Sequence, residues 1–301
     1  MNNSAVLLID CPDRKGLVAR VAGMLYKHGA NILHADQHED HEQGLFFMRV
    51  EWALAGSASL DKSRGEEGKS HSGEILDLEG FKREFGPLAE ELTMRWQLFA
   101  GERRPRVALF CSQYLHCMAD LLHRWHTGEL DCEIPVIVSN HREVENLAAF
   151  YGIPFEHVAI SAATKAEAEA RQIALVKKHD VELIVLARYM QILSPEFVAS
   201  FPAGIINVHH SFLPAFTGAK PYHAAHERGV KLIGATSHYV TSVLDDGPII
   251  EQDVARISHR DQVEDLVARG RDLERLVLSR AVRWHLDRRI LCYGNKTVVF
   301  D

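Results

Sequence analysis

The sequence predicts an α/β protein with two structural units, and three observations support this. The chain has 301 residues, enough for two domains of which one holds a substantial core. Through residues 1–98, apolar residues recur with the periods of strands and helices in the order βαββαβ. From residue 106 onward, near-continuous apolar strands alternate with helices, which indicates a mostly parallel sheet covered on both faces.

The N-terminal unit is predicted element by element from these patterns. Between Leu17 and His28 the apolar residues follow helical spacing, and Gly29 is well placed to end that helix. Residues 56–73 consist mainly of Ser, Gly, Lys and Glu, a composition that cannot bury a core, so we expect a mobile insertion there. The other elements are expected at Ala5–Ile9, Asn31–His38, Leu45–Trp52 and Thr93–Leu98 as strands, and at Leu78–Leu92 as a helix.

Residues 99–105 are the expected linker, and residues 106–301 form the second unit. Two short apolar runs around Gly294 and Asn295 suggest a hairpin near its end. Its strands are expected at Val107–Cys111, Ile134–Val138, Leu183–Leu186, Ile205–Val208 and Gly234–Val240. Its helices are expected at Tyr114–His126, Arg142–Tyr151, Lys165–His179 and Gln262–Asp287.

Composition argues against several functional classes. The net charge of -7 gives no electrostatic reason to expect nucleic-acid binding. No stretch approaches the roughly 20 apolar residues of a membrane span, so no membrane partner is expected. The five cysteines contain no CxxC pair, which argues against a disulfide framework and a zinc cluster, and favours a reducing, cytoplasmic location.

Several of the 18 histidines lie in polar segments. His34, His38 and His41 fall within one such segment beside carboxylates. Histidine and carboxylates are common metal ligands, but this spacing matches no closed metal site. We therefore expect a solvated loop or strand edge there, and no metal.

An amide, an imidazole and a carboxylate form the strongest candidate site. Asn207 and His209 end a buried strand and stand two residues apart, so their side chains point to the same face. Asp245 lies at a turn bounded by glycine and proline. Alone, the amide could cap the strand and the histidine could belong to the core. Ligands of such sheets bind at the carboxyl ends of strands, and these three groups together can polarise a carbonyl, stabilise its oxyanion and move a proton.

These residues resemble a known family, the folate-dependent formyltransferase superfamily. The resemblance rests on Asn207-x-His209, Ser211-Phe212-Leu213-Pro214 and Leu244-Asp245-x-Gly247-Pro248. Further motifs resemble its hydrolytic branch, the formyltetrahydrofolate deformylases: His209-His210, Pro214-Ala215-Phe216-x-Gly218-Ala219-x-Pro221-Tyr222-His223 and Gly234-Ala235-Thr236-x-His238-Tyr239. The N-terminal unit resembles an ACT domain, which precedes the catalytic domain in that branch. The resemblance implies a ferredoxin-like ACT domain followed by a Rossmann-like, formyltransferase-type domain.

The same resemblance implies an activity and roles for the site. The expected reaction is hydrolysis of 10-formyltetrahydrofolate to tetrahydrofolate and formate, which supplies formate for purine synthesis and balances one-carbon folate pools. Asn207 and protonated His209 would donate hydrogen bonds to the formyl oxygen. Asp245 would keep His209 charged, position the water and pass a proton to the leaving nitrogen, directly or through His209. His210 replaces a proline typical of the transferases, and either positions water or packs.

The resemblance also implies a folate pocket without any cofactor, because the folate is the substrate. The segment from Tyr189 to Leu193 would line the pterin site, largely through its backbone, or else form an ordinary short helix on the sheet. Gly218 would allow a close backbone approach. The expected substrate contacts are Tyr189, Met190, Gln191, Ile192, Leu193, Gly218, Thr241 and Val243.

Two alternatives concern regulation and reaction type. In the N-terminal unit, Asp10, Gly16, Asn31 and Ile32 occupy places where ACT domains bind an amino-acid effector, although a purely structural dimerising module fits equally well. We expect a homo-oligomer, a dimer or a tetramer. The alternative reaction is transfer of the formyl group to an amine acceptor by the same three residues. The ACT-like leader and the two adjacent histidines favour hydrolysis, and the intact triad argues against a non-catalytic binding protein.

Overall fold

The computed structural model describes residues 4–54, 78–101, 103–215 and 221–300. Contacts divide the chain into two compact units, Met1–Arg103 with Val298–Asp301, and Arg104–Thr297. The insertion expected at residues 56–73 and Gly218 lie outside the described residues. Within the described residues, no helix is both long enough and apolar enough to cross a membrane.

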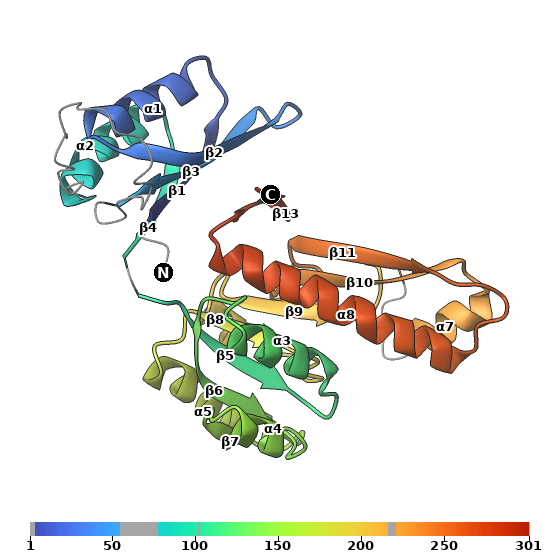
Figure 1. The fold of residues 1–301 in the computed structure, drawn as a ribbon. Helices are drawn as coiled ribbons and strands as arrows, with labels where there is room; N and C mark the ends of the chain where they lie inside the picture. The colour runs from blue at the N-terminus through green and yellow to red at the C-terminus, as the bar shows by residue number, and fades with distance from the viewer. Residues whose placement is uncertain (1–3, 55–77, 102, 216–220, 301) are drawn as a thin grey trace, which may run out of the picture. The chain divides into compact units, whose positions relative to one another are not determined.

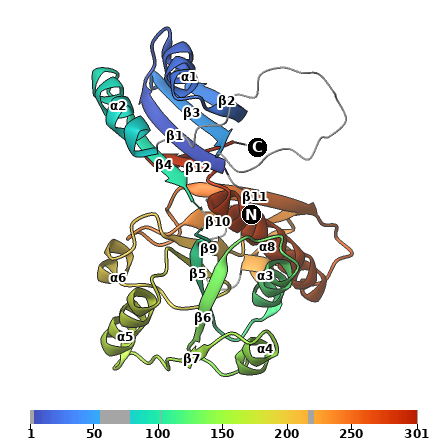
Figure 2. The same cartoon turned by 60° about the vertical axis from the view of Figure 1, so that its left-hand side comes forward.

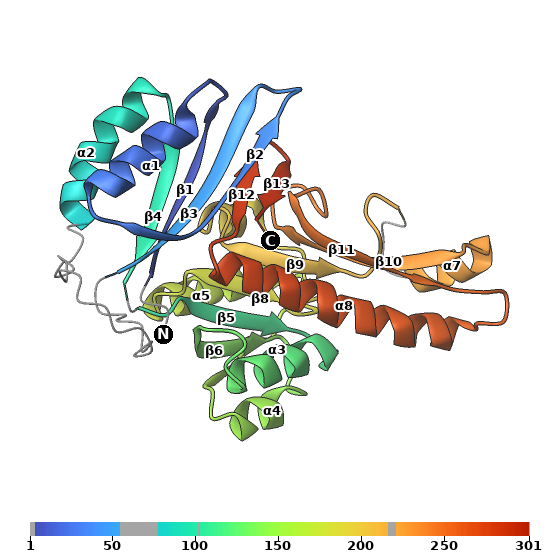
Figure 3. The ribbon, with the colours of Figure 1, turned by 45° about the horizontal axis from the view of Figure 1, so that its top comes forward.

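The first unit has the predicted βαββαβ order. Its four strands form an antiparallel sheet in the order β2-β3-β1-β4. Both helices pack on one face of that sheet, where a single apolar cluster forms the core (Figure 3). The elements are β1 (Ser4–Pro12), α1 (Leu17–Lys27), β2 (Asn31–Asp40), β3 (Leu45–Ala53), α2 (Leu78–Glu91) and β4 (Arg95–Ala100).

The last strand of this unit differs from the prediction. It begins at Arg95 rather than Thr93 and runs to Ala100, into the segment expected to be a linker. The cause lies in the turn after α2, where Thr93 adopts a left-handed φ of 55° and the amide of Met94 bonds back to Ala89. Two residues are therefore used to end the helix before the strand can start.

The second unit is built on a seven-stranded sheet in the order β11-β10-β9-β8-β5-β6-β7, and a separate hairpin of β12 and β13 (Figure 1). Strands β5 to β9 are parallel, whereas β10 is antiparallel to both of its neighbours. The strands are β5 (Arg106–Cys111), β6 (Glu133–Ser139), β7 (Phe155–His157), β8 (Leu183–Leu186), β9 (Ile205–His209), β10 (Leu232–Tyr239), β11 (Ile249–Arg256), β12 (Ile290–Tyr293) and β13 (Lys296–Val299). The helices are α3 (His116–His126), α4 (Glu145–Phe150), α5 (Lys165–Lys178), α6 (Pro195–Ala199), α7 (Pro221–Arg228) and α8 (Val263–Leu286).

Helices cover both faces of this sheet, which confirms the predicted architecture. α5 and α6 pack on one face around Phe110 and Phe197, and α3, α4 and α8 pack on the other around Met118 and Val277 (Figure 2). The parallel strands are buried on both sides, since all four residues of β8 are buried. Such strands need nearly continuous apolar sequence, and this explains why they were predictable.

Four elements of the second unit were not predicted: β7, α6, α7 and β11. β7 has three residues and α6 has five, too short to show a period. β11 lies at the sheet edge and is interrupted by three consecutive polar residues, Glu251, Gln252 and Asp253, so it has no continuous apolar run. The hairpin around Gly294 was predicted correctly.

The strand order creates a switch point between β5 and β8. From β5 the chain moves outward through β6 and β7, then returns to add β8 and β9 on the other side. Loops at the carboxyl ends of β5 and β8 therefore diverge and leave a crevice there. Asn207 and His209 lie on β9, next to this point.

Candidate active site

The pairing of β9 with β10 sets the position of the Asn207 amide. The antiparallel register places His238 directly opposite Asn207. The Asn207 Nδ2 atom lies 3.3 Å from His238 Nε2, and His238 Nδ1 lies 2.9 Å from the backbone oxygen of Tyr239. A carbonyl oxygen only accepts, so Nδ1 carries the hydrogen; Nε2 accepts from the amide when the ring is neutral and donates to Asp245 when the ring is protonated. His238 thereby orients the Asn207 side chain.

Asp245 reaches the end of β9 from the segment between β10 and β11. Its Oδ2 atom lies 3.2 Å from His209 Nδ1, and its Oδ1 atom lies 3.7 Å from His238 Nε2. The structure thus brings Asn207, His209 and Asp245 together, with His238 between them. All of these side chains are mostly buried.

The turn that carries Asp245 depends on backbone geometry. Asp245 itself has a left-handed φ of 56°. At Gly247 a Cβ atom would overlap the carbonyl oxygen of Tyr239, at the end of β10. Only glycine lets the chain pass this close to β10, and the close passage sets the Asp245 carboxylate over the site.

The electrostatics of the site favour an ion pair. Burial raises the pKa of Asp245, but hydrogen bonds and charge from His209 and His238 outweigh burial and hold that pKa well below its usual range. The ionised carboxylate lies 3.2 Å from His209 Nδ1. The other ring nitrogen of His209, Nε2, is buried and has no hydrogen-bond partner among the described residues. It is available to a substrate.

A cleft of about 360 Å³ opens onto these groups. Its walls are the segment after β8 and the segment after β10, which carry four exposed apolar side chains: Met190, Ile192, Val243 and Leu244. Exposed apolar residues that converge on a few polar groups are typical of ligand sites. The expected substrate contacts Tyr189, Met190, Gln191, Ile192, Leu193, Thr241 and Val243 all line this cleft.

The segment from Tyr189 to Leu193 has an irregular backbone and does not form the alternative short helix. The amide of Met190 donates to the Ser112 hydroxyl at 3.0 Å, which fixes the segment to the loop after β5. The Tyr189 side chain points into the core, where its hydroxyl accepts from Gln172 at 2.7 Å and burial raises its pKa to about 12. Tyr189 therefore faces the cleft through its backbone.

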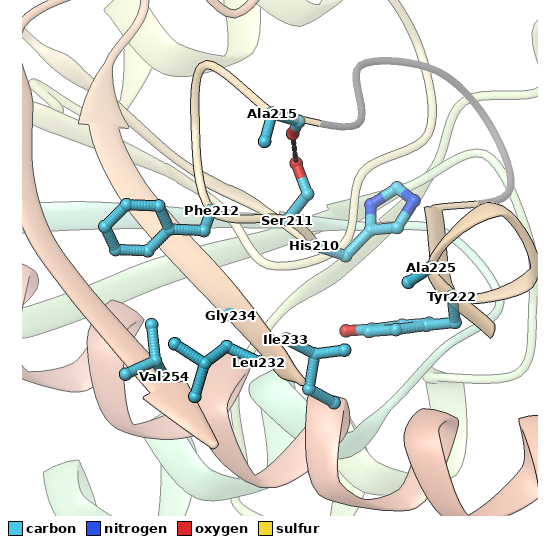
Figure 4. Close-up of a pocket in the computed structure, with 10 residues that line it drawn as sticks. All are labelled: His210, Ser211, Phe212, Ala215, Tyr222, Ala225, Leu232, Ile233, Gly234 and Val254. Carbon is cyan, nitrogen blue, oxygen red and sulfur yellow. Dashed lines mark hydrogen bonds between the residues drawn. The ribbon is translucent and has the colours of Figure 1, made fainter. Parts of the chain in front are cut away.

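His210 separates this cleft from a second, apolar pocket of about 390 Å³. Its ring centroid lies 5.2 Å from that of His209 and 6.1 Å from that of Tyr222. Figure 4 shows His210 and Tyr222 side by side, with the Ser211 hydroxyl donating to the Ala215 carbonyl. Both readings of His210, water positioning and packing, agree with this position, and its role stays a prediction.

The structure does not bring the expected effector residues together: Asp10 is level with Phe47 of β3, whereas Asn31 is level with Ala53, at the opposite end of that strand. Asp10, near the end of β1, forms an ion pair with Arg95 at 2.7 Å, so its carboxylate is already engaged. Gly16 precedes α1 with a φ of 91°, and the exposed residues Asn31 and Ile32 start β2. Their role in effector binding stays a prediction.

The histidines considered as metal ligands are spread along β2 and the turn that follows. His34 and His38 are exposed on β2, and His41 pairs with Glu39 at 2.7 Å. In the described part of the chain, none of them belongs to a cluster with metal-binding geometry.

Three further residues near the site were not identified from the sequence: His238, Arg188 and Glu274. His238 belongs to one of the motifs described above. Pairing β9 with β10 would have placed it opposite Asn207 and so identified it. Arg188 follows β8 by two residues, again at a carboxyl end. Glu274 lies on α8, with hydrogen-bond partners up to 158 residues away, and no local signal marks it.

Comparison with known proteins agrees with this fold. A family model described as Formyl transferase matches residues 105–282, and one described as ACT domain matches residues 5–58. The chain is therefore a formyl transferase-type protein with an N-terminal ACT domain. It is 51% identical to the formyltetrahydrofolate deformylase of Synechocystis sp. over 299 residues, which cover 99% of each chain. The chain belongs to the formyltetrahydrofolate deformylase family.

Solved structures separate the hydrolytic branch from the transferases. The formyltetrahydrofolate deformylase of Pseudomonas syringae pv. tomato superposes with a TM-score of 0.90 at 47% identity, covering 99% of this chain and 94% of that one. Glycinamide ribonucleotide transformylase 1 from Symbiobacterium toebii has a TM-score of 0.62 at 27% identity, covering 68% of this chain and 98% of that one. The likeness to the deformylase is greater and includes the ACT domain.

Proposed function

We propose that Asn207, His209 and Asp245 catalyse hydrolysis of 10-formyltetrahydrofolate to tetrahydrofolate and formate. One observation carries this proposal. His209 is held by Asp245 through Nδ1, its buried Nε2 has no partner among the described residues, and the residue lines a substrate-sized cleft. A buried polar atom without a partner is costly unless a ligand satisfies it.

In the proposed reaction, water attacks the formyl carbon and negative charge develops on the formyl oxygen. Protonated His209 donates to that oxygen through Nε2. The Asn207 amide has two hydrogens on Nδ2, of which His238 accepts one and the formyl oxygen accepts the other. Loss of one such donor typically costs about 10²–10³ in rate.

The depressed pKa of Asp245 supports a role through His209 rather than as a strong base. An effective general base has a pKa near the working pH, and this carboxylate has a pKa far below it. Asp245 would keep His209 charged and orient the attacking water. As the carbon–nitrogen bond breaks, one water proton goes to the leaving nitrogen, the other goes to solvent, and the formyl carbon leaves as formate.

The cleft walls support folate binding on the same side. The segment from Tyr189 to Leu193 and the segment from Thr241 to Val243 both line the cleft. Peptide groups can pair with the ring edge of a pterin, while the exposed apolar side chains cover its faces. We assign the pterin to this space.

The first unit supports a second proposal, assembly into a homo-oligomer with an amino-acid effector at its ACT domain. β2 is a ten-residue edge strand, and Leu33 on it is 57% exposed. Such an edge can pair with a second copy. Light scattering would give the assembly size, and a screen of amino acids against formate release would test regulation.

The test of the catalytic proposal is formate release from 10-formyltetrahydrofolate with water as the only acceptor. We expect formate and tetrahydrofolate in equal amounts, and no gain when amines are added. Formylated amine with no free formate would contradict hydrolysis.

A further inference from the structure

Arg188 is the one permanent cation on the wall of the catalytic cleft. Among the described residues that line the cleft, no other lysine or arginine occurs. Arg188 follows β8 by two residues and lines the same cleft as His209. Its side chain is only 10% exposed. A charge this buried needs a counter-charge, which Glu274 supplies.

The backbone at Arg188 is held in an unfavourable conformation. Its φ of 62° lies in the left-handed region, which long side chains rarely adopt. The loop after β5 fixes it there, because the Ser112 amide donates to the Arg188 carbonyl at 3.2 Å and the Ser112 hydroxyl accepts from Met190. Strain of this kind persists where the surrounding structure imposes it, and it clusters at functional sites.

The surroundings of the guanidinium orient it without using its hydrogen bonds. Its central carbon lies 5.3 Å from the centre of the Tyr114 ring. The nearest carboxylate, Glu274, lies 3.4 Å from Nε, yet Nε has no hydrogen-bond partner among the described residues. Glu274 already accepts hydrogen bonds from Tyr222 and His116, both at 2.7 Å. The guanidinium fork is therefore free to bind a ligand.

The chemistry of hydrolysis supplies a matching ligand. Transfer of a formyl group to an amine ends with a neutral amide, whereas hydrolysis ends with a carboxylate anion. A guanidinium binds a carboxylate through two parallel hydrogen bonds, and that geometry suits arginine better than lysine. The carboxylate would be produced at His209, in the cleft that Arg188 also lines.

We propose that Arg188 forms a carboxylate subsite in the catalytic cleft and receives the formate that hydrolysis produces. The inference rests on the proposed function. The glutamyl carboxylate of a folate is the other source of the same chemistry, and formate is favoured because Arg188 lines the cleft that holds His209.

The test measures formate binding directly, by NMR of isotopically labelled formate added to the full-length chain. Arg188→Gln should weaken formate binding at least about tenfold, as expected for loss of charge-assisted hydrogen bonds. Arg271→Gln is the matched control, because Arg271 also lies near the Tyr114 ring, at 5.9 Å, but is exposed and does not line the cleft. It should bind formate as the parent chain does. Arg188→Lys keeps the charge beside Glu274 and should weaken binding without loss of the fold.

Formate binding and KM, measured together, show whether Arg188 binds formate or the glutamyl carboxylate of the folate. If formate binding falls in Arg188→Gln while KM changes equally for substrates with and without the glutamyl tail, the subsite holds formate. If KM rises only for the substrate with the tail, the subsite holds the tail, and the assignment to formate is overturned. Unchanged formate binding and unchanged KM would overturn the subsite altogether. Because binding is measured without turnover, a chain that binds formate but releases none would refute the proposed function alone.

Discussion

Asp245 and Glu274 are two buried carboxylates of the second unit, and each has histidine neighbours of its own. They differ in how many of their hydrogen-bonding positions other residues of the protein already use. The Asp245 side chain is 14% exposed and comes from a turn, with His209 and His238 at 3.2 and 3.7 Å. The Glu274 side chain is 1% exposed on α8, with Tyr222 and His116 both at 2.7 Å. The first cluster is open to the cleft, and the second is closed within the protein.

The difference shows which buried charge can react. In the Asp245 cluster, His209 keeps an unpartnered nitrogen that a substrate can satisfy. In the Glu274 cluster, both carboxylate oxygens already accept hydrogen bonds, so this carboxylate fixes the structure around it. A group with unused bonding capacity at a cleft is suited to catalysis, and a fully bonded one to positioning.

The largest expected effect is on turnover at the open cluster. Asp245→Asn should reduce formate release by about 10³-fold or more, because the neutral amide no longer stabilises the imidazolium of His209. A coupled assay of formate and tetrahydrofolate measures this. Asp246→Asn changes the neighbouring exposed carboxyl and should be nearly normal. Equal losses of formate release in the Asp245 and Asp246 variants would contradict a special role for the carboxylate of the open cluster.

The closed cluster should affect stability instead. Glu274→Gln should lower the free energy of unfolding by about 3–5 kcal/mol, because it leaves the Arg188 cation buried without its counter-charge. Urea unfolding followed by circular dichroism measures the loss. Glu264→Gln, on the exposed first turn of the same helix, is the control and should change stability little. A Glu274 variant as stable as the control would show that the cluster is not structural.

The pH dependence of the free energy of unfolding distinguishes the contribution of the buried His285 imidazole from that of the two carboxylates. Burial lowers the pKa of His285 to about 3, whereas an unfolded histidine has a pKa of about 6.5. Between these values the unfolded state binds more protons, so stability falls as pH falls. We expect a loss of about 2 kcal/mol from pH 7 to pH 5. Both carboxylates have lowered pKa values and stay ionised over this range, so they add no slope.

The control for that titration is His285→Gln. This variant removes the titrating ring, and the Tyr239 hydroxyl, 2.7 Å from His285 Nδ1, can pair with the new amide. Its stability should be nearly flat between pH 7 and pH 5. An unchanged slope would mean that another group titrates there.

The smallest effect is expected from one hydrogen bond of the closed cluster. Tyr222→Phe removes the donor to Glu274 Oε1 and should lower the free energy of unfolding by about 1.5 kcal/mol. Thermal unfolding measures the loss, and kcat and KM measured separately show whether Tyr222 also supports its neighbour His210. An effect larger than that of Glu274→Gln would reverse the order of importance within the cluster.

The fold was predictable where sequence patterns are local. Helix α1 and the buried parallel strands carry strong periods or continuous apolar runs, so their sequence alone indicated them. The antiparallel direction of β10 was not predictable, because direction depends on which strand it joins rather than on its own residues. Short elements such as β7 and polar ones such as α7 lack a sufficient signal.

The same contrast applies to the two clusters. Asn207, His209 and Asp245 lie in short motifs next to strand ends, so sequence reasoning grouped them. Glu274 meets its partners Tyr222 and His116 across 52 and 158 residues, a distance that only the folded chain closes. Their pairing could not be derived before the helix and sheet were placed.

Gly247 limits how this site can change during evolution. A methyl group there would collide with the Tyr239 carbonyl, and the turn would have to move together with Asp245, two residues earlier. One mutation at a position that touches no reacting atom would thus displace Asp245 together with the neighbouring cleft wall from Thr241 to Leu244. Selection would therefore act on this glycine as strongly as on the carboxylate that it positions.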